Sequence, residues 1–440
     1  MNELLVVLLI QVTILVGYSI LSLLRINYQS VWLGIPCAFA LGFGFISTEL
    51  FLYSFFGINW NIMSMLFPVI IIMVLTRFWK YSWYLHFKKI PHIDRINMFF
   101  LILIIGLVFF VGFESILRPV SAWDGWASWL LKAKMFYIDG AVHPSQFLYS
   151  ESEYPPYLSM YISFLYIGIG KVDDKAVLLL YPFFYIFLIM SFYYALRLRM
   201  NMGRALLGTF LLASTQNIIR HSGRFEAGQA DLPLAFFMFM SFISLTHFLK
   251  DKNINSLWVL EIILGIIALI KNEGIPFVLC IQIILLITFL RSKAYGRTLS
   301  LIVGFIPIVF WGLYKILNDF PSNYLFTNTQ VEMGRVGVIL VGFVTEFINI
   351  QNWNILWVGF FIALNLVLFR SRKWDLSFTL VLFQLLVYAG IFLLTPIDPA
   401  AHIKNVIDRL YIHISPLAVY AISVTLLPLF MVYDKYNHNR

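Results

Sequence analysis

The sequence has few charged residues and few cysteines, and both shortages restrict the class of protein. Charged residues make up 12% of the 440 residues, whereas a soluble chain is normally about a quarter charged. The two cysteines, Cys37 and Cys280, both lie inside apolar runs. They therefore indicate neither a disulfide framework nor a metal site.

Motifs that bind nucleotides or metal ions are also missing from the sequence. We find no Walker-type phosphate loop, no dinucleotide-binding glycine pattern, no HExxH and no metal-type spacing of Cys and His. Nothing indicates an ATP site or a nucleotide-sugar site. We expect no cofactor.

Apolar residues are abundant instead. They make up 61% of the chain, the mean hydropathy is +0.85, and predominantly apolar runs of about 18 or more residues recur from end to end, each long enough to cross a bilayer. The sequence therefore predicts an all-α, polytopic transmembrane bundle. The net charge of +9 does not indicate nucleic-acid binding, because Lys and Arg of membrane proteins concentrate in cytoplasmic loops. The first apolar run has no basic segment and no cleavage site, so we expect a retained span.

We expect about twelve spans, with boundaries that are the weakest part of the prediction. The basic loop after the third span is assigned to the cytoplasm by the charge rule, which places the loop 118–156 outside. Residues 157–170 are expected to insert only partly, 205–219 to cross outward, and 336–352 to lie on the surface. The predicted division is 1–96 (three spans and a basic cytoplasmic loop), 97–297 (core with the external loop 118–156) and 298–440 (variable C-terminal spans).

The loop 118–156 is the longest polar interruption in the chain. It places Asp124 among tryptophans and continues into a helix-like repeat that carries Lys132 and Lys134. Apolar and basic residues on different sides of a short helix are typical of segments at a membrane surface. Asp124 is then either an acid at the entrance to a cavity or part of an ordinary loop with interfacial tryptophans.

Other ionisable residues are predicted to lie at the external ends of spans, where charged groups are costly unless they pair or line a wet cavity. Contact with lipid headgroups explains the basic members equally well. We predict that Glu49, Glu114 and Glu261 lie near span ends or are paired. The external set comprises Asp124, Glu151, Glu153, Arg224, Glu226, Asp231, Lys271, Glu273, Asp398, His402, Lys404, Asp408 and Arg409.

Four stretches in this order resemble the GT-C glycosyltransferases, polytopic enzymes that use polyprenyl-phosphate-linked sugars and include protein O-mannosyltransferases and lipid A aminoarabinose transferases. The chain has an acid in its first external loop and a Pro-Pro before the next membrane segment. The other three stretches are RFEAGQADLPLAFF at 224–237, ALIKNEG at 268–274 and DRLYIHISP at 408–416. The resemblance covers 97–290 and the C-terminal piece. Many members have a second acid close to the first, and here it would be Asp139, Glu151 or Glu153, or it is missing.

The resemblance implies sugar transfer from a polyprenyl-phosphate donor to a glycan, lipid or protein acceptor, on the external face of a bacterial inner or plasma membrane. Asp124 would be the general base for an inverting displacement. A divalent cation would need Asp124 to meet Glu226 or Asp231, and the sequence does not support one. The implied substrate-binding residues are Arg224, Glu226, Asp231, Lys271, Glu273, His402, Lys404, Arg409, Glu153 and Tyr154.

Two alternatives use related substrates. A flippase or other transporter of lipid-linked saccharides would need charges along a central path, and would not depend on one loop acid. A polymerase or ligase of lipid-linked glycans would share most of the residues above.

Overall fold

The computed structural model describes residues 1–78, 93–148, 154–320, 334–370 and 373–429, and within these ranges it is entirely helical, with no strand. Nine described helical stretches are long and apolar enough to cross a membrane, which confirms the prediction of an all-α membrane bundle. They are Asn2–Leu23 (α1), Val31–Phe56 (α2), Arg95–Leu117 (α4), Asp174–Arg197 (α7 and α8), Asp231–Asp251 (α11), Gly274–Arg291 (α13), Tyr295–Leu317 (η3 and α14), Leu376–Leu394 (α18) and Pro399–Leu426 (α19).

Shorter helices fill the space between these stretches, and the count of about twelve spans stays a prediction because it depends on which of them cross. The apolar ones are Ile62–Phe78 (α3), Tyr157–Ile169 (α6), Met202–Ala213 (α9), Ile254–Ile270 (α12) and Leu356–Phe369 (α17). The remaining ones are Gly125–Trp129 (η1, a π-helical turn), Leu130–Asp139 (α5), Pro144–Phe147 (η2), Gln216–Gly223 (α10), Gly334–Phe347 (α15) and Ile350–Trp353 (α16).

The predicted span 205–219 is two helices in the structure, α9 and α10. The break falls at Ser214 and Thr215, whose hydroxyls donate to the carbonyl of Leu211 at 3.4 and 3.0 Å. Hydroxyl side chains that bond to the preceding turn compete with the helical hydrogen bonds of the backbone. The break places the polar residues of α10 beside the site described below.

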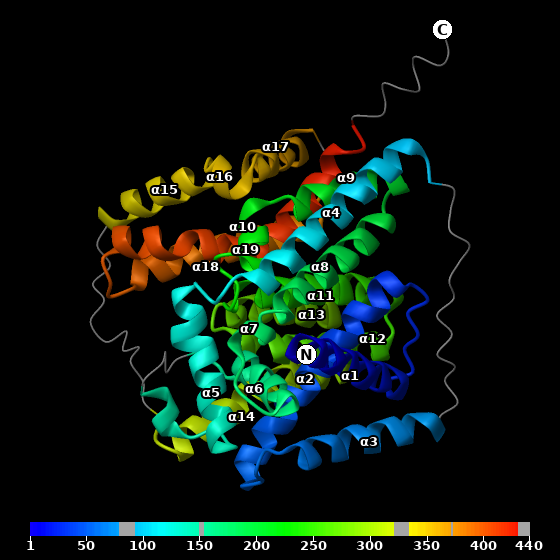
Figure 1. Cartoon of the computed structure of the whole chain (residues 1–440). Helices are drawn as coiled ribbons and strands as arrows, with labels where there is room; N and C mark the ends of the chain where they lie inside the picture. Colours follow the sequence, from blue (N-terminus) through cyan, green and yellow to red (C-terminus); the bar gives the residue numbers. More distant parts are fainter. Residues whose placement is uncertain (79–92, 149–153, 321–333, 371–372, 430–440) are drawn as a thin grey trace.

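The helices are arranged around α8, α11 and α19, whose side chains are largely buried. Figure 1 shows α15, α16 and α17 along one edge of the bundle beside α18 and α19, and α3 along the opposite edge. By contrast, α3, α4 and α14 expose most of their apolar side chains, as expected of helices that face lipid.

Aromatic rings from four helices form the centre of the core. The ring of Phe43 stacks on Tyr161 at 4.5 Å between centroids, and the ring of Phe39 lies 5.3 Å from Phe184 and 6.0 Å from Phe236. Such tilted and edge-on pairs stabilise a core beyond the area that they bury. Helix α2 therefore shares its core with α6, α8 and α11, which all lie in the central part of the chain.

The short helix α5 does not lie on the surface as an amphipathic segment with both lysines facing water. Lys132 is fully buried. Its Nζ faces the rings of Phe147 at 5.0 Å, Trp129 at 5.7 Å and Tyr154 at 5.8 Å. Cation–π attraction of this kind is strongest where water is excluded, so the side of α5 that carries Lys132 faces protein and not water. Lys134 pairs with Asp174.

Helix α19 passes through Pro416 without ending. A proline inside a helix cannot donate to the carbonyl four residues earlier, which here belongs to Ile412. The hydroxyl of Ser415 donates to this carbonyl at 3.0 Å. The hydroxyl thus replaces the missing hydrogen bond, nearly two turns beyond Arg409.

We expect Ser415→Ala to lower the free energy of unfolding by about 1–2 kcal/mol, because it leaves a buried carbonyl without a donor. Ser423→Ala is a matched control in the same helix, since the buried Ser423 hydroxyl has no hydrogen-bond partner among the described residues. Denaturant titration in mixed micelles would compare the two variants. Equal losses of stability in both would contradict this role of Ser415.

Candidate active site

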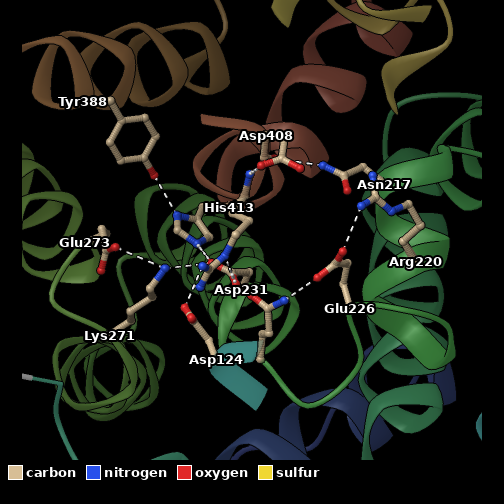
Figure 2. A network of polar contacts seen from close by, with 12 residues as sticks. Asp124, Asn217, Arg220, Glu226, Asp231, Lys271, Glu273, Tyr388, Asp408 and His413 are labelled. Carbon is tan, nitrogen blue, oxygen red and sulfur yellow. Dashed lines mark hydrogen bonds and ion pairs between the residues drawn. The ribbon is translucent and has the colours of Figure 1, made fainter. Parts of the chain in front are cut away.

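Asp231, the first residue of α11, is the centre of a buried ionic network. Its side chain is fully buried. One carboxylate oxygen accepts from Lys271 Nζ at 2.8 Å and from His413 Nε2 at 2.9 Å, and the other accepts from Arg409 Nε at 3.1 Å. Opposite charges at these distances offset the cost of burying Asp231. Figure 2 shows Lys271 and His413 converging on this carboxylate.

Lys271 reaches Asp231 because α12 ends one residue earlier. The backbone of Lys271 is extended, and the next turn closes with a hydrogen bond from Gly274 N to Lys271 O at 2.9 Å. A Cβ on Gly274 would lie 2.6 Å from the carbonyl oxygen of Ile267, so only glycine fits there. The turn also brings Glu273 to within 3.1 Å of Lys271 Nζ.

Arg409 connects Asp231 to the predicted base. Its Nη1 lies 2.6 Å from Asp124 Oδ2, while its Nε contacts Asp231. One planar guanidinium therefore bridges two carboxylates from separate elements, a geometry that lysine cannot reproduce. Its Nη2 is buried and has no hydrogen-bond partner among the described residues.

Asp124 is held in place by the π-helical turn η1, which begins immediately after it. Gly125 packs against the loop that follows α10, where an added Cβ would lie 3.4 Å from backbone atoms of Ala227 and Gly228. Gly228 has a φ of +107°, a conformation that favours glycine. Asp124 is 24% exposed, so its carboxylate is the member of the network most open to a substrate.

His413 and Tyr388 extend the network into the bundle. Asp231 can only accept, so His413 Nε2 donates the proton, and in the neutral ring Nδ1 then accepts from the Tyr388 hydroxyl at 2.9 Å. Both residues are fully buried. This chain fixes the orientation of the imidazole and, through it, one side of Asp231.

A second polar cluster lies beside this network. The guanidinium of Arg220 contacts Glu226 Oε1 at 2.9 Å and Asn352 Oδ1 at 3.2 Å, and Glu226 Oε2 accepts from Gln229 at 2.6 Å. Asn217 Nδ2 donates to the backbone carbonyl of Asp408 at 2.9 Å. Figure 2 shows this cluster and the Asp231 network on neighbouring sides of α19.

His221, on α10, is a neutral member of this region. The side chain is almost fully buried, and neither ring nitrogen has a hydrogen-bond partner in the described part of the chain. Burial lowers the pKa of His221 to about 3, because a charged imidazole is costly away from water. It therefore offers one donor and one acceptor but no charge at neutral pH.

Five residues predicted from separate stretches, Asp124, Asp231, Lys271, Glu273 and Arg409, meet in the Asp231 network. Tyr154 lies at its border, where its ring is 5.8 Å from Lys271 Nζ. Glu151 and Glu153 lie outside the described residues. Asp139 accepts from Gln146 instead of joining the network.

Four other predicted substrate-binding residues do not reach this network. Arg224 Nε pairs with Glu114 at 3.1 Å, and Glu226 pairs with Arg220 in the second cluster. His402 packs edge-on against Phe392, and Lys404 is exposed. The two residues of α19 lie one to two turns before Arg409, which is why the same helix does not bring them to Asp231.

The three acids noted within spans are engaged by neighbouring groups. Glu114 pairs with Arg118 and Arg224, Glu49 accepts from Tyr53 at 2.9 Å, and Glu261 accepts from Gln282 at 2.6 Å. The prediction that such acids are paired or lie near span ends is confirmed for Glu114, which is near the end of α4.

Sequence reasoning did not single out His413, Tyr388 or Arg220 as members of the site. A signal existed for His413, because it follows Arg409 by four residues and so lies on the same face of α19. Tyr388 gives no comparable signal, since His413 lies 25 residues away on another helix. Arg220 pairs with the nearby Glu226, but its other partner, Asn352, is 132 residues away.

Within the described ranges, no group of three or more His, Cys, Asp and Glu side chains has an arrangement that could hold a metal ion. Asp124 and Asp231 are bridged by the guanidinium of Arg409. The guanidinium of Arg409 thus lies between Asp124 and Asp231, where a divalent ion would have to bind.

No protein-family model, no curated protein and no solved structure matches this chain.

Proposed function

We propose that this protein is a GT-C-like membrane glycosyltransferase that transfers a sugar from a polyprenyl-phosphate donor to an envelope glycan, lipid or protein. The bridge that Arg409 forms between Asp124 and Asp231 is the observation that carries the proposal. It places a carboxylate that can accept a proton next to a cation that can hold a phosphate.

In the proposed reaction, the hydroxyl of the acceptor gives its proton to Asp124 as its oxygen attacks the anomeric carbon of the donor. The bond between that carbon and the phosphate oxygen breaks, and polyprenyl phosphate leaves with the electron pair. Arg409 Nη2 and Lys271 Nζ stabilise the charge on the departing phosphate. A single displacement inverts the anomeric centre, with Asp124, the most exposed carboxylate of the Asp231 network among the described residues, acting as base and not as nucleophile.

The position of the network also supports an enzyme over the flippase alternative. Arg409 is ten residues beyond Pro399, about 15 Å along α19. Its ion pairs connect the loop after α4 with Asp231 at the start of α11, and Asp231 in turn pairs with Lys271 at the end of α12. Asp231 begins α11 and Lys271 follows α12, so both lie at one end of the spans, and Arg409 and His413 reach this end from within α19. On the charge rule this end is external, so we place the reaction on the periplasmic side of a bacterial inner membrane.

The resemblance extends the proposal to the fold and the partners. The bundle would be GT-C-like with about twelve crossings, and the prenyl chain would lie against the apolar helices that face lipid, such as α3, α4 and α14. We propose no resident cofactor. A glycan polymerase or ligase would use the same network, and the identity of the acceptor distinguishes it from a transferase of single sugars.

The test is sugar transfer by the purified protein in lipid nanodiscs, with a panel of labelled polyprenyl-phosphate sugars and an envelope fraction as acceptor. Transfer of label from the lipid, with release of polyprenyl phosphate, is the expected result. Movement of the intact donor between leaflets of reconstituted vesicles without release of polyprenyl phosphate would overturn the proposal in favour of a flippase.

We expect Arg409→Lys to lower kcat/KM for the donor about 10- to 100-fold, because an ammonium cannot bridge Asp124 and Asp231 and also present a donor to the phosphate. Arg118→Lys is a matched control, since Arg118 pairs with Glu114 and stacks on Phe225. Steady-state kinetics of donor consumption would compare the two. An equal loss in both variants would argue against a phosphate site at Arg409.

A further inference from the structure

A second group of polar side chains lies next to the proposed phosphate site and has no part in the reaction above. We name it the α10 cluster and define it by its residues, Asn217, Arg220, His221, Glu226, Gln229, Asn352 and Asp408. These residues come from α10, the loop that follows it, α16 and α19. The tertiary fold adds Asn352 and Asp408 to the residues of α10 and its loop.

The α10 cluster and the Asp231 network share two connections along the chain. Asp408 and Arg409 are consecutive in α19, so their side chains leave the helix about 100° apart. Asp408 belongs to the α10 cluster and Arg409 to the Asp231 network. Gln229 precedes Asp231 by two residues and contacts Glu226 at 2.6 Å. A molecule with its phosphate on Arg409 therefore has the α10 cluster as its immediate neighbour.

The α10 cluster has unused hydrogen-bonding capacity. Asn217 Oδ1, Gln229 Oε1 and both ring nitrogens of His221 are buried without a hydrogen-bond partner among the described residues. One oxygen of Asp408 accepts from the backbone N–H of Arg409 at 2.9 Å, and the described residues provide no partner for the other. A buried polar atom without a partner typically costs about 1–3 kcal/mol, so such atoms mark places where a ligand can supply what the protein lacks.

The outer part of the α10 cluster is open enough to be reached. The side chains of Arg220 and Glu226 are 30% and 26% exposed, and they pair with each other at 2.9 Å. Glu346 in the same region provides a comparison. It is buried, and it accepts hydrogen bonds from Asn349, Asn352 and the indole of Trp353, so its carboxylate is fully engaged by protein. The α10 cluster differs from Glu346 because several of its buried donors and acceptors have no hydrogen-bond partner among the described residues.

The geometry points to the α10 cluster as the subsite that recognises the hydroxyl groups of the donor sugar, with Asp408 as the residue that determines which sugar is accepted. This inference rests on the proposed function for the position of the donor phosphate. Carboxylate and amide groups suit sugar hydroxyls, each of which donates one hydrogen bond and accepts others. The sugar is bonded directly to the phosphate, so a donor held at Arg409 places its ring beside Asp408.

Binding measurements test the subsite without relying on transfer. Two probes are compared in nanodiscs: polyprenyl phosphate without a sugar, and the same lipid carrying mannose, glucose, galactose or aminoarabinose. We expect at least one sugar to tighten binding by the wild-type protein about tenfold or more. Asp408→Asn should abolish this gain and leave the Kd of the sugar-free lipid unchanged.

Two further variants make the test specific. Gln229→Met also removes a polar group from the α10 cluster and should reduce the gain, so it serves if Asp408→Asn does not fold. Asp375→Asn removes a carboxylate that caps α18 through Ser377 and should keep the gain. A gain that persists in both cluster variants, or a wild-type protein that binds all probes alike, would overturn the subsite.

The assay separates this inference from the proposed function. A sugar-dependent gain that needs Asp408, combined with no transfer by the wild-type protein, would support the subsite and contradict the enzyme. Transfer in which Asp408→Asn raises only the KM of the acceptor would contradict the assignment to the donor sugar, because the cluster would then hold the acceptor.

Discussion

Asp124→Asn is expected to lower the rate of sugar transfer about 100- to 10,000-fold, the usual loss when a general base is removed. The amide has the shape of the carboxylate but cannot accept the proton of the acceptor hydroxyl. Asp124 is 24% exposed, and its ion pair with Arg409 Nη1 at 2.6 Å involves a single oxygen. Removal of the charge should therefore affect kcat much more than the KM of the donor.

The control for this prediction is Asp139→Asn in the same loop. Asp139 lies at the end of α5 and accepts from Gln146 at 2.5 Å, so its loss should leave transfer nearly unchanged. Initial rates would be measured with both variants at equal amounts of folded protein. A normal rate in Asp124→Asn, or a loss in Asp139→Asn alone, would show that another acid is the base.

Asp231→Leu is expected to have the largest effect on stability, a loss of about 3–5 kcal/mol in the free energy of unfolding. The substitution leaves Lys271, which is 1% exposed, without its shortest ion pair, and it removes an acceptor from Arg409 and His413. Uncompensated charge in the interior of a bundle is far more costly than a lost surface contact.

Lys134→Met provides the comparison for Asp231→Leu. It breaks an ion pair with Asp174 in which both side chains are 30% exposed, and such exposed pairs contribute at most about 1 kcal/mol. Denaturant titration in mixed micelles measures both changes. Similar small losses in the two variants would mean that the Asp231 network does not hold the helices together.

The sequence predicted the class of protein well because membrane insertion depends on composition. Few charges and repeated long apolar runs admit only a helical bundle. The number of crossings is harder to obtain from the sequence. Helix α6 has 13 residues and α12 has 17, and both are largely buried in protein, so a length rule that assumes contact with lipid does not apply to them.

The site was partly predictable for a related reason. Charged residues are rare in this chain, so each one at the end of a span is conspicuous, and Asp124, Asp231 and Arg409 could be selected in that way. Their neutral partners could not be selected. Tyr388 lies within an apolar run like many other tyrosines, and only the packing of α18 against α19 shows that it orients His413.

Lys132 illustrates the opposite error, in which a charge was assigned to the surface by pattern alone. A lysine on a short helix near a membrane usually faces water, but here three aromatic rings and the carbonyl of Tyr154 surround its ammonium group. The hydrophobic periodicity of α5 cannot predict this burial, because Phe147 and Tyr154 come from other segments of the chain.

The hydrogen bonds of Asp231 form in a fixed order during synthesis, because their partners lie at different distances along the chain. Its bond to Lys271 spans 40 residues, so the hairpin of α11 and α12 can neutralise this acid soon after the two helices emerge. Its bonds to Arg409 and His413 span 178 and 182 residues. Helix α19 therefore enters the membrane with Arg409 after both of its acidic partners have been made. The ion pairs with Asp124 and Asp231 then stabilise the inserted helix. Among the described residues, Asp124 pairs with Arg409, so the Asp231 network is complete only once α19 has entered the bundle.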